Sequence, residues 1–253
     1  QGDGLVFIWS LGLPFLPGVR EHGPARPALV VAVYRGGREA FFLFQEYPRE
    51  EFEGEPLGGY WRFGETEIRL RLDGQVELGV RLDLAVPGST ERLRGTIRAR
   101  GAPCVGAPAG AAAHVWSPIL GASLGSAELS GVFSGRLAGR VYLDHNAGMR
   151  PLHELGISRW HWGRLAFSGC DVLWYDVEGE EGGVSVVVEI GADGRLRSAP
   201  ATVERTAPAW SRYGVERPRR LRFLDSSGDP VAVDLLAVVE ASPFYERHLV
   251  RGT

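Results

Sequence analysis

Apolar and polar positions alternate through the first half of the chain. Ile68, Leu70 and Leu72 are separated by charged residues, and the same period of two resumes after the Asp73-Gly74 pair. Because successive side chains of a strand point to opposite faces of a sheet, this pattern is typical of half-buried antiparallel strands. It predicts strands at 67–72, 76–84 and 92–100.

Shorter apolar runs are joined by glycine-rich turns. The segment Arg35-Gly36-Gly37-Arg38 separates the runs 30–33 and 40–45, and glycines between β-forming residues indicate a hairpin. Only 151–155 and the end of the chain hint at helix. Further strands are predicted at 127–142 (with Gly131, Gly135 and Gly139 at bends or bulges), 165–167, 171–176, 184–190, 221–224 and 231–239.

This succession of strands predicts an all-β protein. We expect two lipocalin-like β-barrel or sandwich halves packed together, with few short helices. The halves are placed at 1–120 and 121–253, and the boundary lies near the loop 101–113 or the segment 121–130. The interior of each half, or the junction between them, suits an apolar ligand.

Composition supports strands and narrows the chemistry. The 253 residues include 35 glycines and 16 prolines, which disfavours a helical bundle. All 28 basic residues are arginine, so chemistry at a lysine nucleophile is excluded. A net charge of −3 gives no general support for binding nucleic acid. Cys104 and Cys170 lie far apart, which supports neither a zinc ribbon nor a disulfide scaffold.

No segment reaches the roughly 18 to 20 apolar residues of a membrane helix. We therefore expect a cytoplasmic or peripheral membrane location. Leu5 to Leu16 is either a buried strand or a shallow membrane contact. The basic segment from Glu216 to Arg220 is either a surface loop or a patch that meets anionic lipid headgroups. Residue 1 is Gln, so we expect the natural chain to begin upstream.

Histidines and tryptophans concentrate between residues 114 and 176, which hold four of the six His and four of the seven Trp. In a strand, residues two apart share a face. Pairs on a shared face are therefore expected for His114 with Trp116, Tyr142 with Asp144, and Trp160 with Trp162. Burial among aromatic rings raises the pKa of a carboxyl group, so that it keeps its proton near neutral pH and serves as an acid.

Each of these motifs also has a simpler interpretation. His-x-Trp on a strand is often core packing, and Asp144 with Asn146 is compatible with Asx turns. His114, Asp144, His145 and His161 carry groups that bind metals, yet no spacing among them defines a metal site. The sequence lacks the glycine-rich dinucleotide motif, the phosphate-binding loop and the nucleophile elbow.

At these residues the sequence resembles the carotenoid 1,2-hydratase (hydroxyneurosporene synthase) family. Eight segments match the family in order along most of the chain. They are Phe7-Ile8-Trp9-Ser10, Ala28 to Tyr34, His114-Val-Trp116-Ser-Pro118, Gly139 to Gly148, Pro151-Leu152, Trp160-His161-Trp162-Gly-Arg164, Tyr175-Asp176-Val177 and Ser242-Pro243-Phe244-Tyr245.

The resemblance implies addition of water, without a cofactor, to the terminal C1=C2 double bond of an acyclic carotenoid or related isoprenoid. It makes Asp144 the acid that protonates the alkene. Trp116 and Tyr142 would stabilise the resulting tertiary carbocation, and His114 would activate water. Residues expected around the substrate are His145, Asn146, Trp160, His161, Trp162, Tyr175 and Phe244.

Two departures from the family stand out. His161 takes a position between two tryptophans where the family often has an acidic residue, which would alter the hydrogen bonds around the acid. The chain also ends before an extra strand that the family leads us to expect. Two alternatives stay open, namely a terpenoid or polyene cyclase or pericyclase of the same fold, and a non-catalytic carrier of an apolar ligand.

Overall fold

The computed structural model describes residues 2–11, 26–55, 58–106, 114–148, 156–180, 182–225, 230–241 and 246–252. Within these ranges the chain forms seventeen β-strands and a single short 3-10 helix, η1 (Arg49–Glu51). The prediction of an all-β protein with few short helices is confirmed. No helix in the described ranges is long and apolar enough to cross a membrane.

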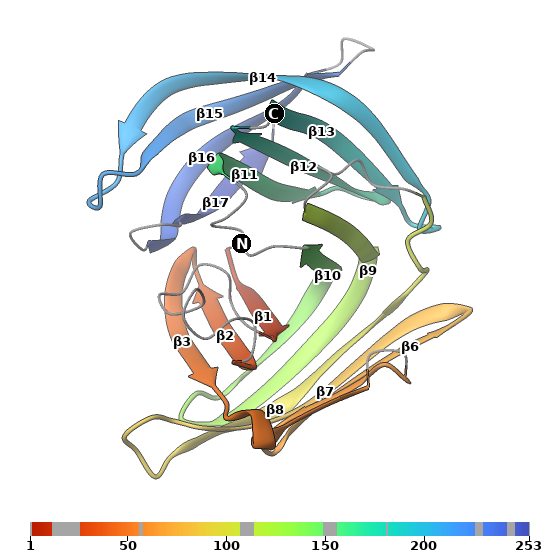
Figure 1. Ribbon diagram of the computed structural model, residues 1–253, viewed down its shortest axis with the longest axis vertical. Helices are drawn as coiled ribbons and strands as arrows, with labels where there is room; N and C mark the ends of the chain where they lie inside the picture. The colour runs from red at the N-terminus through yellow and green to blue at the C-terminus, as the bar shows by residue number, and fades with distance from the viewer. Residues whose placement is uncertain are drawn as a thin grey trace.

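The strands form three antiparallel sheets (Figure 1). The first contains β1 (Gly4–Ser10), β2 (Ala28–Arg35) and β3 (Arg38–Glu46). The second has the order β10-β9-β8-β7-β6-β5-β4, and the third runs from β11 to β17 in chain order.

Within the second and third sheets all strands lie beside their neighbours in sequence, as hairpins require. In the second sheet they are β4 (Phe52–Glu55), β5 (Tyr60–Phe63), β6 (Thr66–Asp73), β7 (Gln75–Ala85), β8 (Arg92–Gly101), β9 (His114–Gly131) and β10 (Gly135–Gly148). In the third they are β11 (Ile157–Ala166), β12 (Cys170–Gly179), β13 (Gly182–Gly191), β14 (Leu196–Trp210), β15 (Glu216–Asp225), β16 (Pro230–Ala241) and β17 (Glu246–Gly252).

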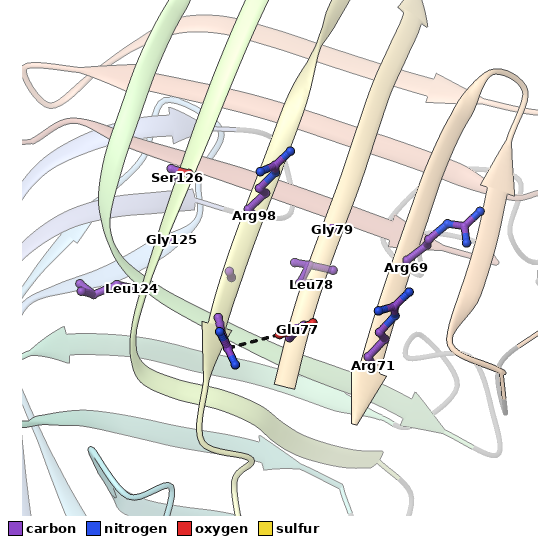
Figure 2. Close-up of a pocket in the computed structure, with 11 residues that line it drawn as sticks. Arg69, Arg71, Glu77, Leu78, Gly79, Arg98, Leu124, Gly125 and Ser126 are labelled. Carbon is purple, nitrogen blue, oxygen red and sulfur yellow. Dashed lines mark ion pairs between the residues drawn. The ribbon is translucent and has the colours of Figure 1, made fainter. Parts of the chain in front are cut away.

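The alternating pattern in β6 to β8 produces the expected two faces. Ile68 is fully buried and Leu70 is nearly so, in a core shared by the first and second sheets. Arg69, Arg71 and Arg98 are exposed on the opposite face of the second sheet (Figure 2). The hairpin at Gly36 and Gly37 is also confirmed, and both glycines have positive φ.

Two sequence predictions of local structure are wrong. The expected strand 127–142 is a hairpin, in which β9 ends at Gly131 and β10 begins at Gly135, so these glycines flank a turn. The end of the chain is strand β17, paired with β16, because its residues gain a partner that lies earlier in the sequence. The suggested helix at 151–155 and Phe244 lie outside the described residues.

Three apolar clusters organise the molecule. The first lies between the first and second sheets, and another is built from the third sheet alone around Trp174 and Phe223. Between them a cluster joins Trp116 of β9 to Tyr175 of β12, where the third sheet meets the end of the second (Figure 1). The chain changes sheet between β10 and β11, and β9 runs through residues 120 and 121. The division into two domains between residues 120 and 121 stays a prediction.

Candidate active site at the junction of the sheets

Irregular pairing between β9 and β10 turns side chains from one core to the other. The register shifts on both sides of Leu143, and nearby Ala122 has a φ of 50°. Such bulges re-aim the side chains that follow. Leu120 and Leu143 therefore pack in the first core, whereas Trp116 and Tyr142 pack in the cluster at the junction.

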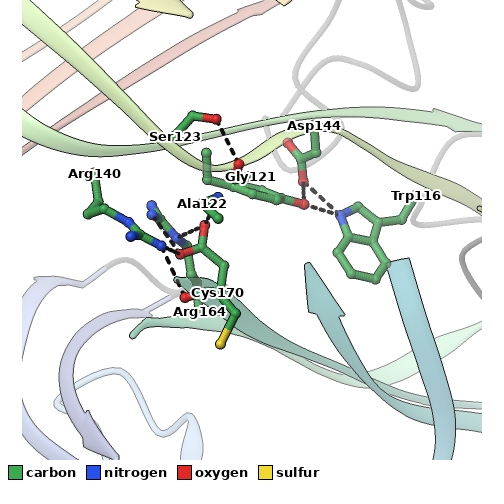
Figure 3. Close-up of polar contacts among 10 residues, drawn as sticks. Trp116, Gly121, Ala122, Ser123, Arg140, Asp144, Arg164 and Cys170 are labelled. Atoms are coloured by element: carbon green, nitrogen blue, oxygen red, sulfur yellow. Dashed lines mark hydrogen bonds and ion pairs between the residues drawn. The ribbon is translucent and has the colours of Figure 1, made fainter. Parts of the chain in front are cut away.

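Trp116, Tyr142 and Asp144 form a compact hydrogen-bonded triad (Figure 3). The indole Nε1–H of Trp116 donates to Asp144 Oδ2 at 2.8 Å and to the Tyr142 hydroxyl oxygen at 2.9 Å. The Tyr142 hydroxyl donates in turn to Asp144 Oδ2 at 3.2 Å. One carboxylate oxygen thus receives donors from two aromatic side chains, as the shared-face argument predicted for Tyr142 and Asp144.

Burial perturbs the acidity of this triad. It raises the pKa of Asp144 above its usual value, although hydrogen bonds from Trp116, Tyr142 and Asn146 oppose the rise. Burial also raises the pKa of Tyr142 well above its usual value, and the negative charge of Asp144 adds to this. Tyr142 therefore keeps its hydroxyl proton near neutral pH, and the Asp144 carboxyl holds its proton more tightly than an exposed aspartate does.

Aromatic rings from the third sheet cover the triad. Trp116 is only 1% exposed and stacks on Tyr175, with ring centroids 5.4 Å apart and planes 4° from each other. Trp160 of β11 meets Tyr175 edge-on at 5.8 Å, and Trp162 tilts against Tyr142 at 5.6 Å. Burial raises the pKa of Tyr175 to about 12. Tyr175 and Trp162 thus lie against the two partners of Asp144, and Trp160 lies against Tyr175.

His161 takes a different position from the one the sequence suggested. It lies between Trp160 and Trp162 on β11, so strand alternation points it to the opposite face. There its Nδ1 lies 3.0 Å from Oδ2 of Asp176. Burial would raise the pKa of Asp176, but hydrogen bonds from His161, Ser185 and Arg205 outweigh it and hold the pKa low. His161 therefore takes part in a separate network and makes no contact with the acid in the described structure.

The remaining predicted residues divide between the site and its surroundings. Asn146 pairs across the strands with Trp116 and hydrogen-bonds to Asp144, and both Asn146 and His145 are exposed. The backbone of His114 begins β9, but its side chain lies outside the described part of the structure, as does Phe244.

A fully buried aspartate that the sequence did not single out anchors the site. Asp171, at the start of β12, is 0% exposed. Its Oδ2 accepts hydrogen bonds from the Ala122 backbone N–H at 2.7 Å and from Arg164 Nε at 3.0 Å. Its Oδ1 accepts one from Arg140 Nη2 at 3.0 Å (Figure 3). Asp171 thereby ties β12 to β9, β10 and β11.

Arg164 connects this anchor to the triad, because its guanidinium carbon lies 5.8 Å from the centre of the Tyr142 ring. The sequence could have indicated Arg164, because it belongs to the Trp-His-Trp-Gly-Arg segment. It gave no such indication for Asp171, which stands at the start of an ordinary apolar strand. Among the described residues, no group of three or more His, Cys, Asp or Glu side chains is arranged to hold a metal ion.

Three comparisons relate the chain to known proteins. A carotenoid hydratase CrtC family model matches residues 62–253. A hydroxyneurosporene dehydrogenase from Chlorobaculum tepidum is 25% identical over an alignment spanning 98% of this chain and 73% of the relative. A crystal structure from Nitrosomonas europaea, of a protein described as AttH, aligns with a TM-score of 0.55 and 12% identity.

That alignment covers 83% of this chain and 69% of the other, and it bears on the fold alone. It confirms the lipocalin-like all-β prediction. The family match includes β6 to β17 and therefore every described residue of the site. The chain belongs to the carotenoid hydratase CrtC family.

Proposed function

We propose that this protein adds water to the terminal C1=C2 double bond of an acyclic carotenoid or related isoprenoid, without a cofactor. Family membership supports a carotenoid-modifying enzyme. The observation that carries the finer proposal is the raised pKa of Asp144 beside two aromatic donors. Protonating an unactivated alkene needs an acid that still holds its proton at the working pH, and a buried carboxyl group with a raised pKa meets that need.

The reaction proceeds in two balanced steps. The Asp144 carboxyl transfers its proton to the alkene carbon that becomes a methylene, and the π electrons form the new C–H bond. The neighbouring carbon is left as a tertiary cation. A water oxygen then attacks this cation to form the C–O bond and releases one proton to a base, for which we propose His114. Return of that proton to Asp144 completes the cycle, with no net oxidation or reduction.

The aromatic residues act on the cation between these steps. Aromatic faces carry partial negative charge, so the rings of Trp116 and Tyr142 favour a nearby positive charge. Their hydrogen bonds to Asp144 also stabilise the carboxylate that forms when its proton leaves. Asn146, Trp160, Trp162 and Tyr175 are proposed to contact the polyene, together with His145 and Phe244.

The proposal is tested by incubating the purified protein with lycopene or neurosporene in detergent and measuring product mass. We expect a gain of one water, and a loss of at least about 100-fold in rate for Asp144→Asn. Asp193→Asn is the matched control, because Asp193 lies exposed in the turn after β13. It should keep the wild-type rate.

Other outcomes separate the alternatives. Loss of two hydrogens would indicate a dehydrogenase, the activity in the name of the Chlorobaculum relative. A product of unchanged mass would indicate a cyclase or pericyclase. Retention of the polyene without turnover would indicate a carrier. Each of these results, or an undiminished Asp144→Asn variant, would refute hydration by Asp144.

A further inference from the structure

A broad concavity lies on the outer face of the second sheet, away from the triad (Figure 2). Its volume is about 760 Å³, and it is lined by side chains of β6, β7, β8 and β9. Four of the lining residues are arginines, Arg69, Arg71, Arg98 and Arg100, and the single acidic one is Glu77. This small area therefore holds three excess positive charges in a chain whose net charge is −3.

Two of these four arginines have no acidic partner in the described ranges, and a third shares its partner with Arg81. Arg100 pairs with Glu77 at 3.2 Å. Arg69 Nη2 lies 3.9 Å from a carboxylate oxygen of Glu67, which is a long ion pair. Arg71 and Arg98 form no ion pair with any residue in the described ranges. The excess of positive charge is confined to the concavity. Two residues further along the strands of the same face, Arg81 pairs with Glu67 at 2.9 Å and Arg136 pairs with Glu128 at 2.8 Å.

The backbone leaves the centre of the concavity open. Gly79 is the cross-strand neighbour of both Arg69 and Arg98, and a Cβ atom at this position would meet nothing within 4 Å. The two guanidinium groups thus flank a gap that no side chain fills. At the edge, Leu124 pairs across the strands with Arg100 and is 68% exposed. An apolar side chain therefore stands beside the cations.

We propose that this face docks the protein on the phosphate headgroups of an anionic lipid bilayer. Several arginines over a broad open surface suit many phosphates in one plane, and Leu124 is positioned to enter the interface between headgroups and acyl chains. The functional reason for docking on a bilayer rests on the proposed function, because a carotenoid substrate dissolves in the bilayer. The positive charge of this face is observed independently of the proposed function.

The basic segment 216–220, which the sequence offered as a lipid contact, is a weaker candidate. It belongs to β15, where Arg217 pairs with Glu246 at 3.1 Å and Arg220 pairs with Asp234 at 3.4 Å. These arginines already have acidic partners within the third sheet.

The test is sedimentation with vesicles of phosphatidylcholine alone or mixed with phosphatidylglycerol. We expect binding to the anionic vesicles only, and its loss in high salt. Each arginine near such a surface contributes about fivefold in affinity, so R69Q/R98Q should bind roughly 25-fold more weakly. R195Q/R222Q removes the same charge from exposed positions before β14 and on β15, and it should bind as wild type does.

Three results would overturn the proposal: equal binding to neutral vesicles, no binding to either kind, or equal weakening by both double variants. Titration with inorganic phosphate identifies a site for free anions, and phosphate binding without vesicle binding would also refute docking. Vesicle binding needs no turnover, so Asp144→Asn should dock normally. The docking surface and the proposed reaction can therefore fail independently.

Discussion

The indole ring of Trp116 in β9 lies parallel to the phenol ring of Tyr175 in β12, with 5.4 Å between their centroids. The two residues belong to different sheets, so this stack is a direct contact across the junction. It also holds the indole while Nε1–H donates to Asp144 at 2.8 Å. The proton affinity of the acid thus depends on how the two sheets pack together.

Replacing Trp116 with Phe is expected to shift the pH dependence of hydration. Phe keeps a ring against Tyr175 but lacks the N–H that lowers the pKa of Asp144. Without that donor the pKa of Asp144 rises further. Activity, which needs the protonated acid, should then persist to higher pH. The measurement is kcat/KM against pH, read from the position of the alkaline limb, because loss of the indole also lowers the maximum rate.

Tyr175→Phe is the matched control for this shift. It keeps the stacked ring and leaves both donors to Asp144 in place. Its alkaline limb should coincide with that of the wild-type protein. A Trp116→Phe limb at the wild-type position, or one displaced to lower pH, would contradict the assignment of Asp144 as the group that titrates.

The same carboxyl should make stability depend on pH. The pKa of Asp144 is raised in the folded protein, so its contribution is fully present below the unfolded value of about 4 and is lost as pH rises through the folded pKa. Asp144→Asn cannot ionise. The free energy of unfolding of wild type relative to this variant should therefore fall across that window and then level off. Urea titrations at a series of pH values measure it, and a difference that grows with pH would exclude a raised pKa.

The sequence predicted one pair of the triad, Tyr142 with Asp144, by a local argument. Strand alternation puts Tyr142 and Asp144 on one face, and the same rule correctly pairs Trp160 with Trp162. The same rule implies that His161 points away from the two tryptophans, and in the structure it lies beside Asp176. The prediction from sequence instead placed His161 with the tryptophans, because all three are aromatic residues of one segment. A period of two thus places residues that lie two apart, but it fails over the irregular part of β9, where Trp116 and Leu120 pack in different cores.

Contacts between distant strands were beyond such reasoning. Asp171 meets the Ala122 N–H and Arg140 only because β12 packs across the bulge of β9, and no local pattern encodes that packing. Strand β14 was missed for a related reason. Its residues are largely polar or small and include Pro200 and Pro208, so its order comes from pairing with β13 and β15.

Asp171→Asn should destabilise the fold strongly. The substitution leaves Arg140 and Arg164 without the charge that both carboxylate oxygens provide in a fully buried position. Removing one partner of a buried ion pair costs about 3–5 kcal/mol. Urea unfolding measures the loss, and Asp193→Asn in an exposed turn should change stability by no more than about 0.5 kcal/mol. Equal small effects for both variants would show that Asp171 does not anchor the junction.

Gly163→Ala tests the packing behind the paired tryptophans. A Cβ at Gly163 would clash with Cζ2 of Trp174, whose ring packs against Phe223 in the core of the third sheet. We expect a loss of about 1–3 kcal/mol, because this core must shift to admit a methyl group.

Gly139→Ala on β10 is its control, since a Cβ there would meet nothing within 4 Å. It should leave stability within about 1 kcal/mol of wild type. The clash lies on the face of β11 opposite Trp160 and Trp162, where strand alternation also directs His161. Gly163→Ala should therefore lower the unfolding temperature clearly. It should change the pH of the alkaline limb of kcat/KM much less. A shifted limb with unchanged stability would mean that residue 163 acts on the triad itself.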